Sequence, residues 1–164
     1  MILRQRHHAG FGRQGDRIEV RLSQDERDLI EELANQFRSV LEADHDPDLR
    51  RLYPTAYPEE PNRNNEYTAL VHDDLVTARL EAVDVVLATS SSNSIKNEEL
   101  GSWMNMFNGL RLLIGNRLDV CEDDVFDPFA EDAPARALLV WLSHLLEEAV
   151  GVANDFLPPP YPRE

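Results

Sequence analysis

The chain is poor in the residues that build covalent and metal centres. Its 164 residues include a single cysteine, Cys121, which excludes both an intramolecular disulfide and a two-cysteine metal or redox pair. The longest uninterrupted apolar stretch is 137–142, far short of the roughly 18 residues that a membrane-spanning helix needs. The charged start of the chain is not followed by an apolar segment, so no export signal is predicted. We therefore expect a cytoplasmic protein with no membrane span.

Positive charge is scarce and unevenly placed. The net charge is −15, although five arginines against two acidic residues make the first 21 residues +3 and leave −18 on the rest. Such an acidic body repels phosphate backbones, because nucleic-acid affinity depends largely on Lys and Arg. DNA contact is therefore expected only through the N-terminal arm, although a solubilising terminus is the simpler interpretation. The candidate contact residues in that arm are Arg4, Arg6, Arg13 and Arg17.

Motifs for catalysis and cofactor binding are also missing. The sequence has no Gly-x-Ser-x-Gly, no phosphate-binding loop and no Gly-x-Gly-x-x-Gly, so neither catalytic residues nor a cofactor are predicted. Helical spacing does place His144 one turn from Glu147, which is the alternative basis for a helical metal protein or enzyme. Di-iron bundles need two Glu-x-x-His pairs, whereas this pair is reversed and single. A solvated helix face is the favoured interpretation, and no metal ligand is assigned.

Helical periodicity dominates what is present. Apolar residues recur every three or four positions over residues 66–88, 98–118 and 135–156, and a capping box of Ser23 and Glu26 opens an earlier helix. Asn97 is the expected cap of the pattern at 98–118. A short helix is predicted after Asp46, with Pro47 in its first turn and Pro54 at its end.

A short hairpin is predicted before the helices, because residues 17–22 alternate polar and apolar side chains after three glycines. The expected fold class is therefore all-α: four long helices plus a short helix in a bundle, with a small N-terminal β-hairpin. The predicted organisation is a basic arm and β-hairpin at 1–22, a helical bundle domain at 23–157 and a Pro-rich tail at 158–164. A surplus apolar face on the bundle would allow a homodimer.

Two arginines lie on or beside the apolar stripe of the helix predicted over 98–118. A buried guanidinium usually has a carboxylate partner, because an unpaired buried charge is costly. We therefore predict structural ion pairs for Arg111 and Arg117. The partners considered lie on other helices and are Asp73, Asp74, Asp84 and Glu147.

An acidic segment that also carries two phenylalanines separates the last two long helices. Glu122, Asp123 and Asp124 are predicted to contact a basic partner, although an exposed turn explains them as well. Cys121 precedes these carboxylates, and their negative charge disfavours a reactive thiolate. Cys121 is kept as the one redox candidate, through an intermolecular disulfide or a sulfenic acid.

Three stretches carry a pattern that points to a family. They read Asp-Pro-x-Leu-Arg-Arg-Leu-x-Pro-x-Ala-Tyr at 46–57, Trp-x-x-x-Phe-Asn-x-Leu-Arg-Leu-x-Ile-Gly-x-Arg-Leu at 103–118, and Trp-Leu at 141–142. Over residues 18–157 the chain resembles an actinobacterial family of unknown function that is named for an oxidative-stress transcriptional regulator. The resemblance implies regulation through contacts with a sigma factor or the transcription machinery, with oxidants sensed by cysteine. With a single thiol, an internal disulfide switch is unavailable to this chain.

Together these observations favour a non-catalytic cytoplasmic regulatory or adaptor module. Its expected role is oxidative-stress transcription control through protein contacts, with DNA as a possible additional partner of the arm.

Overall fold

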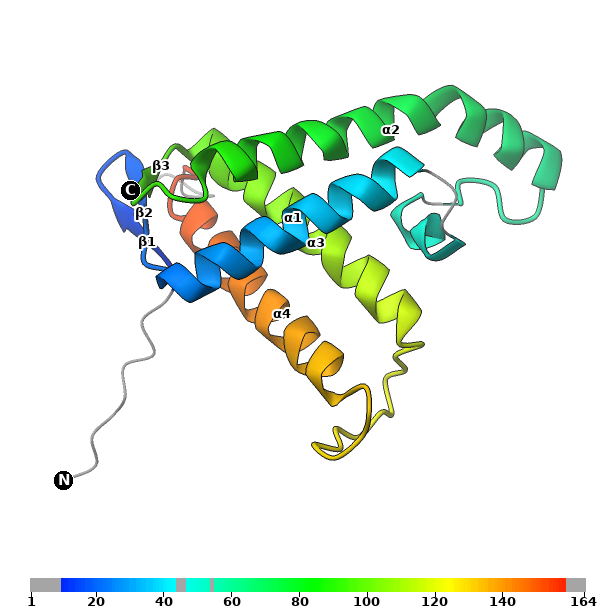
Figure 1. Cartoon of the computed structure of the whole chain (residues 1–164). Coiled ribbons are helices and arrows are strands. Elements are labelled where there is room, and N and C mark those ends of the chain that lie inside the picture. The colour runs from blue at the N-terminus through cyan, green and yellow to red at the C-terminus, as the bar shows by residue number, and fades with distance from the viewer. Residues whose placement is uncertain (1–9, 44–46, 54, 159–164) are drawn as a thin grey trace, which may run out of the picture.

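The fold is built around one central helix. The computed structural model describes residues 10–43, 47–53 and 55–158. In chain order the elements are strands β1 (Phe11–Gln14) and β2 (Arg17–Val20), helix α1 (Gln24–Ala43), the 3-10 helix η1 (Pro47–Leu52), helix α2 (Pro61–Thr89), strand β3 (Ser94–Ile95), and helices α3 (Asn97–Arg117) and α4 (Ala133–Asn154). The predicted fold, mostly helical with four long helices, a short helix and an N-terminal hairpin, is confirmed (Figure 1). Asp46 and Pro54, the expected ends of the short helix, lie outside the described residues, as do 159–164 of the Pro-rich tail.

The hairpin belongs to a three-stranded antiparallel sheet that the sequence pattern only partly revealed. Strand β1 pairs with β2 from Phe11↔Val20 to Gln14↔Arg17, and Gly15 in the turn takes a positive φ of 65° that glycine adopts without strain. Strand β3 then pairs with β2 through Ile18↔Ile95. The polar segment after α2 therefore supplies an edge strand of the sheet.

The apolar face of the sheet is continuous with the helical core. Phe11 is buried, and its ring lies edge-on to that of Trp103 on α3, with centroids 5.6 Å apart. Edge-to-face aromatic pairs of this kind add to the stabilisation that comes from burial alone. The hairpin and the bundle thus share one hydrophobic core rather than forming separate cores.

Local capping explains where two of the helices begin. At the start of α1, the Ser23 N–H donates to Glu26 Oε2 at 2.8 Å and the Glu26 N–H donates to Ser23 Oγ at 3.3 Å, which is the predicted capping box. The cap of α3 differs from the expectation, because Asn97 is the first helical residue. There the extended residue Lys96 precedes the helix, and its N–H donates to Glu99 Oε2 at 2.7 Å.

Helix α3 holds the middle of the bundle and packs against α1, α2, α4 and η1. Its buried residues include Leu100, Trp103, Phe107, Leu110 and Leu113. Helix α4 packs on α3 and β1, yet Val140 and Val150 on its outer face remain exposed. Only α3 is therefore central among the long helices.

Helix α2 is a core helix in its second half only. Its buried residues are Ala82, Val83 and Val86, whereas no residue between Pro61 and Glu81 is buried and Leu70 is 80% exposed. Figure 1 shows the first half of α2 extending past the other long helices, with η1 beneath it. Within the described chain, none of the helices combines the length and apolarity needed to cross a membrane.

Candidate functional site

The segment between α3 and α4, residues 119–132, carries the densest charge of the described chain, and we call it the acidic loop. It begins at Asp119, whose φ of 49° is left-handed and turns the chain away from α3. No basic residue occurs in the loop, and its seven carboxylates belong to Asp119, Glu122, Asp123, Asp124, Asp127, Glu131 and Asp132. The loop is therefore a concentrated negative patch at one end of the molecule.

A single arginine of α4 binds the middle and the C-terminal end of the acidic loop. Arg136 Nη1 donates to Asp124 Oδ2 at 3.0 Å, and Arg136 Nε donates to Asp132 Oδ2 at 2.7 Å. Asp124 Oδ2 also accepts the Cys121 backbone N–H at 3.1 Å. That backbone bond and the arginine together lower the pKa of Asp124, while the two carboxylates raise the pKa of Arg136. We call this arrangement the Arg136 clamp.

Between the clamped positions the loop displays large apolar side chains to solvent. Val125 is 89% exposed, Phe129 is 93% exposed and Phe126 is 52% exposed. A turn holds Phe129 in place, because its backbone N–H donates to Asp127 Oδ1 at 2.9 Å. Beside Phe126 lies a pocket of about 150 Å³, whose other apolar walls are Val120, Leu139 and Val140. Exposed aromatic groups on a held loop are typical of recognition surfaces.

Cys121 lies in the same region. It is exposed and lines the small pocket beside Phe126, and its Sγ is 3.6 Å from the Asp119 carbonyl oxygen. Among the described residues, no histidine, lysine or arginine is hydrogen-bonded to the sulfur. The carboxylates predicted to contact a partner, Glu122, Asp123 and Asp124, are thus brought together with the redox candidate on one surface.

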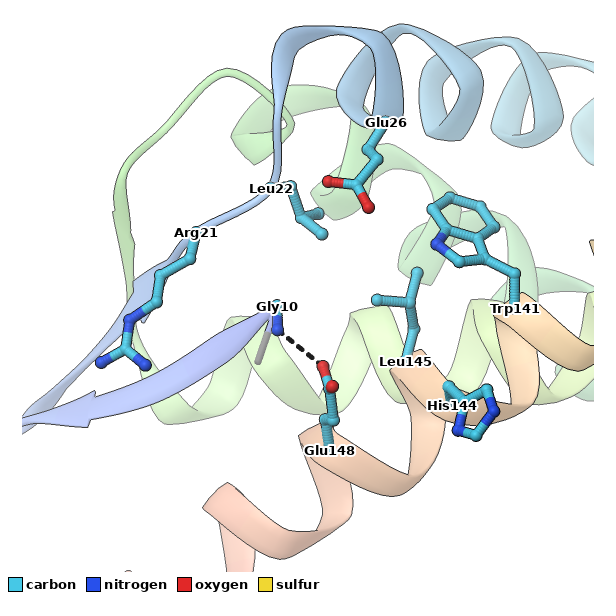
Figure 2. Close-up of a pocket in the computed structure, with 8 residues that line it drawn as sticks. All are labelled: Gly10, Arg21, Leu22, Glu26, Trp141, His144, Leu145 and Glu148. Atoms are coloured by element: carbon cyan, nitrogen blue, oxygen red, sulfur yellow. Dashed lines mark hydrogen bonds between the residues drawn. The ribbon is translucent and has the colours of Figure 1, made fainter. Parts of the chain in front are cut away.

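A larger depression lies where β1, α1 and α4 meet, and Figure 2 shows it. Its volume is about 440 Å³, and it is lined by His144 and Glu148 of α4 but not by Glu147. His144 and Glu147 are both exposed. Across the described ranges, no three His, Cys, Asp or Glu residues come close enough to hold a metal ion. The His144 and Glu147 pair is consequently not completed by a third ligand there.

The arginines of the N-terminal arm divide into two groups. Arg13 Nη1 donates to the Asp155 carbonyl oxygen at 2.6 Å, and its guanidinium lies 4.6 Å from the centroid of the Phe156 ring. Arg17 Nε donates to Ser94 Oγ at 2.8 Å and ties β2 to β3. Both side chains therefore bind within the protein, whereas Arg4 and Arg6 lie outside the described residues.

The two arginines of α3 also differ from each other. Arg117 Nε lies 3.4 Å from Asp48 Oδ2, so its ion pair reaches η1 rather than any of the partners considered from sequence. Arg111 forms no ion pair with a described carboxylate, and its Nε donates to Ser143 Oγ of α4 at 2.8 Å. The expectation of an ion pair for Arg111 is corrected accordingly. Arg111 is only partly buried, so water and the Ser143 hydroxyl can satisfy the hydrogen-bond donors of its guanidinium without a carboxylate.

Sequence reasoning missed a heavily hydrogen-bonded side chain, Arg27 of α1. Arg27 is 6% exposed and makes five hydrogen bonds, with Nε to Leu22 O, Nη1 to Ser90 O and Ser92 O, and Nη2 to Val20 O and Asn93 Oδ1. It joins α1 to β2 and to the polar turn before β3. A signal was available, because Arg27 falls three residues before Ile30 on the buried face of that helix.

A second missed arginine is Arg79 of α2. Its Nε is buried without a hydrogen-bond partner in the described chain, and Nη1 reaches Asn105 Oδ1 only at 3.4 Å. Burial lowers the pKa of Arg79, and Tyr53 partly offsets this effect. Arg79 lies against α3 beside Gly109, where a Cβ atom would be 2.9 Å from Nη1.

Comparison with known proteins gives a family but no function. Residues 7–153 match the family described as Domain of unknown function (DUF2017), and the chain belongs to that family. Neither a curated protein nor a solved structure matches the chain.

Proposed function

We propose that this protein is a non-catalytic regulatory or adaptor module that acts through protein contacts. The observation that carries the proposal is the exposure of Val125, Phe126 and Phe129 on the acidic loop, between the two carboxylates that the Arg136 clamp binds. Large apolar side chains that are exposed among carboxylates of the same loop suit an interface with an apolar centre and a charged rim. The charge of the rim favours a basic partner surface and speeds the encounter with it.

The proposed setting is transcription control under oxidative stress, and the support for it is the resemblance of residues 46–57 and 103–118 noted above. A sigma factor or another part of the transcription machinery is the proposed partner. Any DNA contact would fall to Arg4 and Arg6, since Arg13 and Arg17 are engaged within the fold. Cys121 is the proposed redox position, because it is exposed on the same surface as the loop carboxylates.

Phe129→Ser is the variant that tests the loop. Because Phe129 is 93% exposed, its removal should leave the fold intact and change the free energy of unfolding by less than about 0.5 kcal/mol. Leu70→Ser is the matched control, since Leu70 is 80% exposed on α2, away from the acidic loop. Wild type and both variants are used as bait in resting and oxidant-treated cells, and transcription components are quantified by mass spectrometry. Binding to the recovered component is then measured with purified proteins.

We expect wild type and Leu70→Ser to recover a transcription component. Phe129→Ser should bind that component with an affinity at least about tenfold weaker than wild type. If wild type recovers no such component in either condition, the proposed setting is wrong. Equal binding by Phe129→Ser and Leu70→Ser would show that the acidic loop is not the contact surface. A Cys121→Ser arm that abolishes any oxidant-dependent change would assign that change to the one thiol.

A further inference from the structure

The depression shown in Figure 2 has leucines on its floor and two carboxylates on its walls. Leu22 and Leu145 point into it, and Trp141 of α4 stands at one side. Two glutamates from different helices also line it, Glu26 of α1 and Glu148 of α4. Its volume of about 440 Å³ is within the range of small-ligand sites. It shares no lining residue with the pocket of the acidic loop.

Both carboxylates are oriented by backbone hydrogen bonds. Glu148 Oε2 accepts the Gly10 N–H at 2.6 Å, where the chain enters β1, and Glu26 Oε2 accepts the Ser23 N–H at 2.8 Å. Each carboxylate makes no other hydrogen bond to the described chain, so one oxygen of each is left for a ligand. A side chain fixed in this way needs less reorganisation when a cation arrives.

The local charge of the depression is negative even though Arg21 also lines it. Arg21 Nε is paired with Glu19 Oε2 at 2.8 Å, and in Figure 2 its guanidinium points away from both glutamates. Its stacking over Gly12 fixes that direction, because a Cβ atom at Gly12 would lie 2.4 Å from Arg21 Nη2. His144 lies at the outer side and is exposed. The two glutamates therefore dominate the electrostatics of the interior.

We infer that this depression binds a guanidinium group carried on an apolar stem, the chemistry of an arginine side chain. A planar guanidinium stacks on an indole face such as that of Trp141 and forms paired hydrogen bonds to carboxylates. Its methylene stem packs on leucines such as Leu22 and Leu145. An ammonium matches the charge but neither the plane nor the paired donors. This site is independent of the proposed function of the acidic loop.

The test is a titration of the full-length protein, followed by the amide and indole signals in ¹⁵N-edited NMR spectra. The probes are agmatine and two short blocked peptides that differ only in having arginine or lysine at the centre. The Gly10 amide and the Trp141 indole should shift and saturate with agmatine up to about 20 mM, well above a millimolar Kd. The buried Trp103 indole, which donates to Thr89 Oγ1 at 2.9 Å, is the internal control and should not move.

Glu148→Gln removes the charge but keeps an oxygen that can accept the Gly10 N–H, so the fold should persist. It should weaken agmatine binding about fivefold, the size of one partly solvated charge pair. Glu147→Gln is the matched control, because that neighbouring residue is exposed and does not line the depression. Glu26→Gln is the second variant and should act in the same direction as Glu148→Gln.

Tighter binding of agmatine than of the arginine peptide would indicate a free small guanidinium as the ligand, and the opposite order would indicate an arginine of a partner polypeptide. Both orders support the inference. The inference is overturned if neither agmatine nor the arginine peptide shifts the Gly10 and Trp141 signals saturably, if the lysine peptide binds as well as the arginine peptide, or if Glu147→Gln and Glu148→Gln weaken binding equally.

Discussion

An arginine organises each end of the molecule, and the two do so in opposite ways. At the sheet end, Arg27 is buried and its donors go to backbone carbonyls and one amide oxygen. At the loop end, Arg136 is partly exposed and bridges two carboxylates of the acidic loop. At the sheet end, the guanidinium of Arg27 is buried, whereas at the loop end phenylalanine side chains are exposed to solvent. Folding stability is therefore expected to depend on the sheet end, and recognition on the loop end.

The two arginines differ in their expected effect on stability because one is surrounded by protein and the other is partly exposed to water. A buried donor or acceptor that loses its partner carries the full cost of desolvation, while a surface ion pair exchanges its partner for water at little cost. Ser90 adds to the sheet end, because its hydroxyl donates to Glu31, four residues after Arg27 on the same helix. Loss of the Arg27 guanidinium would therefore leave several hydrogen-bond acceptors at the sheet end without a donor.

The largest effect is expected when Arg27 is replaced by methionine. Arg27→Met keeps a similar apolar stem but leaves three buried carbonyls, the part-buried Ser92 carbonyl and the Asn93 amide oxygen without their donor, which should cost about 3 to 5 kcal/mol in all. The free energy of unfolding is measured by urea denaturation followed by circular dichroism. Arg63→Met is the control, because Arg63 is exposed and forms a 3.6 Å surface pair with Glu60. A loss at Arg27 no larger than at Arg63 would contradict the assignment of stability to the sheet end.

How far the sequence could predict these two ends depends on the range of the contacts. The Ser23 and Glu26 cap, the Gly15 turn and the helical stripes are local, and all were predictable from spacing. The bonds of Arg27 span 63 residues to Ser90 and 65 to Ser92, and no local pattern reports such a contact. Strand β3 was missed for the same reason, since a two-residue strand exists only through its pairing with β2.

The candidate surfaces likewise combine local features that the sequence predicts with longer-range contacts that it does not. The carboxylates of the acidic loop stand out in the sequence, but the clamp depends on Arg136 meeting Asp124 from twelve residues away. His144 was noticed because of Glu147, yet the structure places it instead beside Glu148, Trp141 and the start of β1. The exposed half of α2 escaped prediction because its apolar spacing matches that of a buried helix, and spacing alone does not say whether a partner is there.

An intermediate effect is expected from a pair of glycines on α3, between the two ends. An alanine Cβ at Gly109 would lie 2.7 Å from the ring of the buried Phe37, so Gly109→Ala should destabilise the protein by about 1 to 3 kcal/mol through overpacking. At Gly101 no atom lies within 4 Å of the added Cβ, and Gly101→Ala should stabilise it by about 0.5 to 1 kcal/mol through helix propensity. Urea denaturation of both variants measures the difference, and equal signs would show that the core around Phe37 is looser than described.

The smallest effect is expected at the loop end on acidification. The Cys121 N–H and Arg136 hold the pKa of Asp124 below its usual range, so the Arg136 clamp is stabilising above that range and is lost only as the pH falls through the lowered pKa. The titration of the Asp124 carboxyl and of the Cys121 amide is followed by NMR, with circular dichroism at each pH to verify that the helices remain folded. The midpoint should lie below the ordinary aspartate value of about 3.9, and Arg136→Gln should raise it while leaving the bundle folded. A midpoint at or above the ordinary value in wild type would mean that the clamp does not persist in solution, and the apolar side chains of the acidic loop would then lose the fixed presentation on which their recognition role rests.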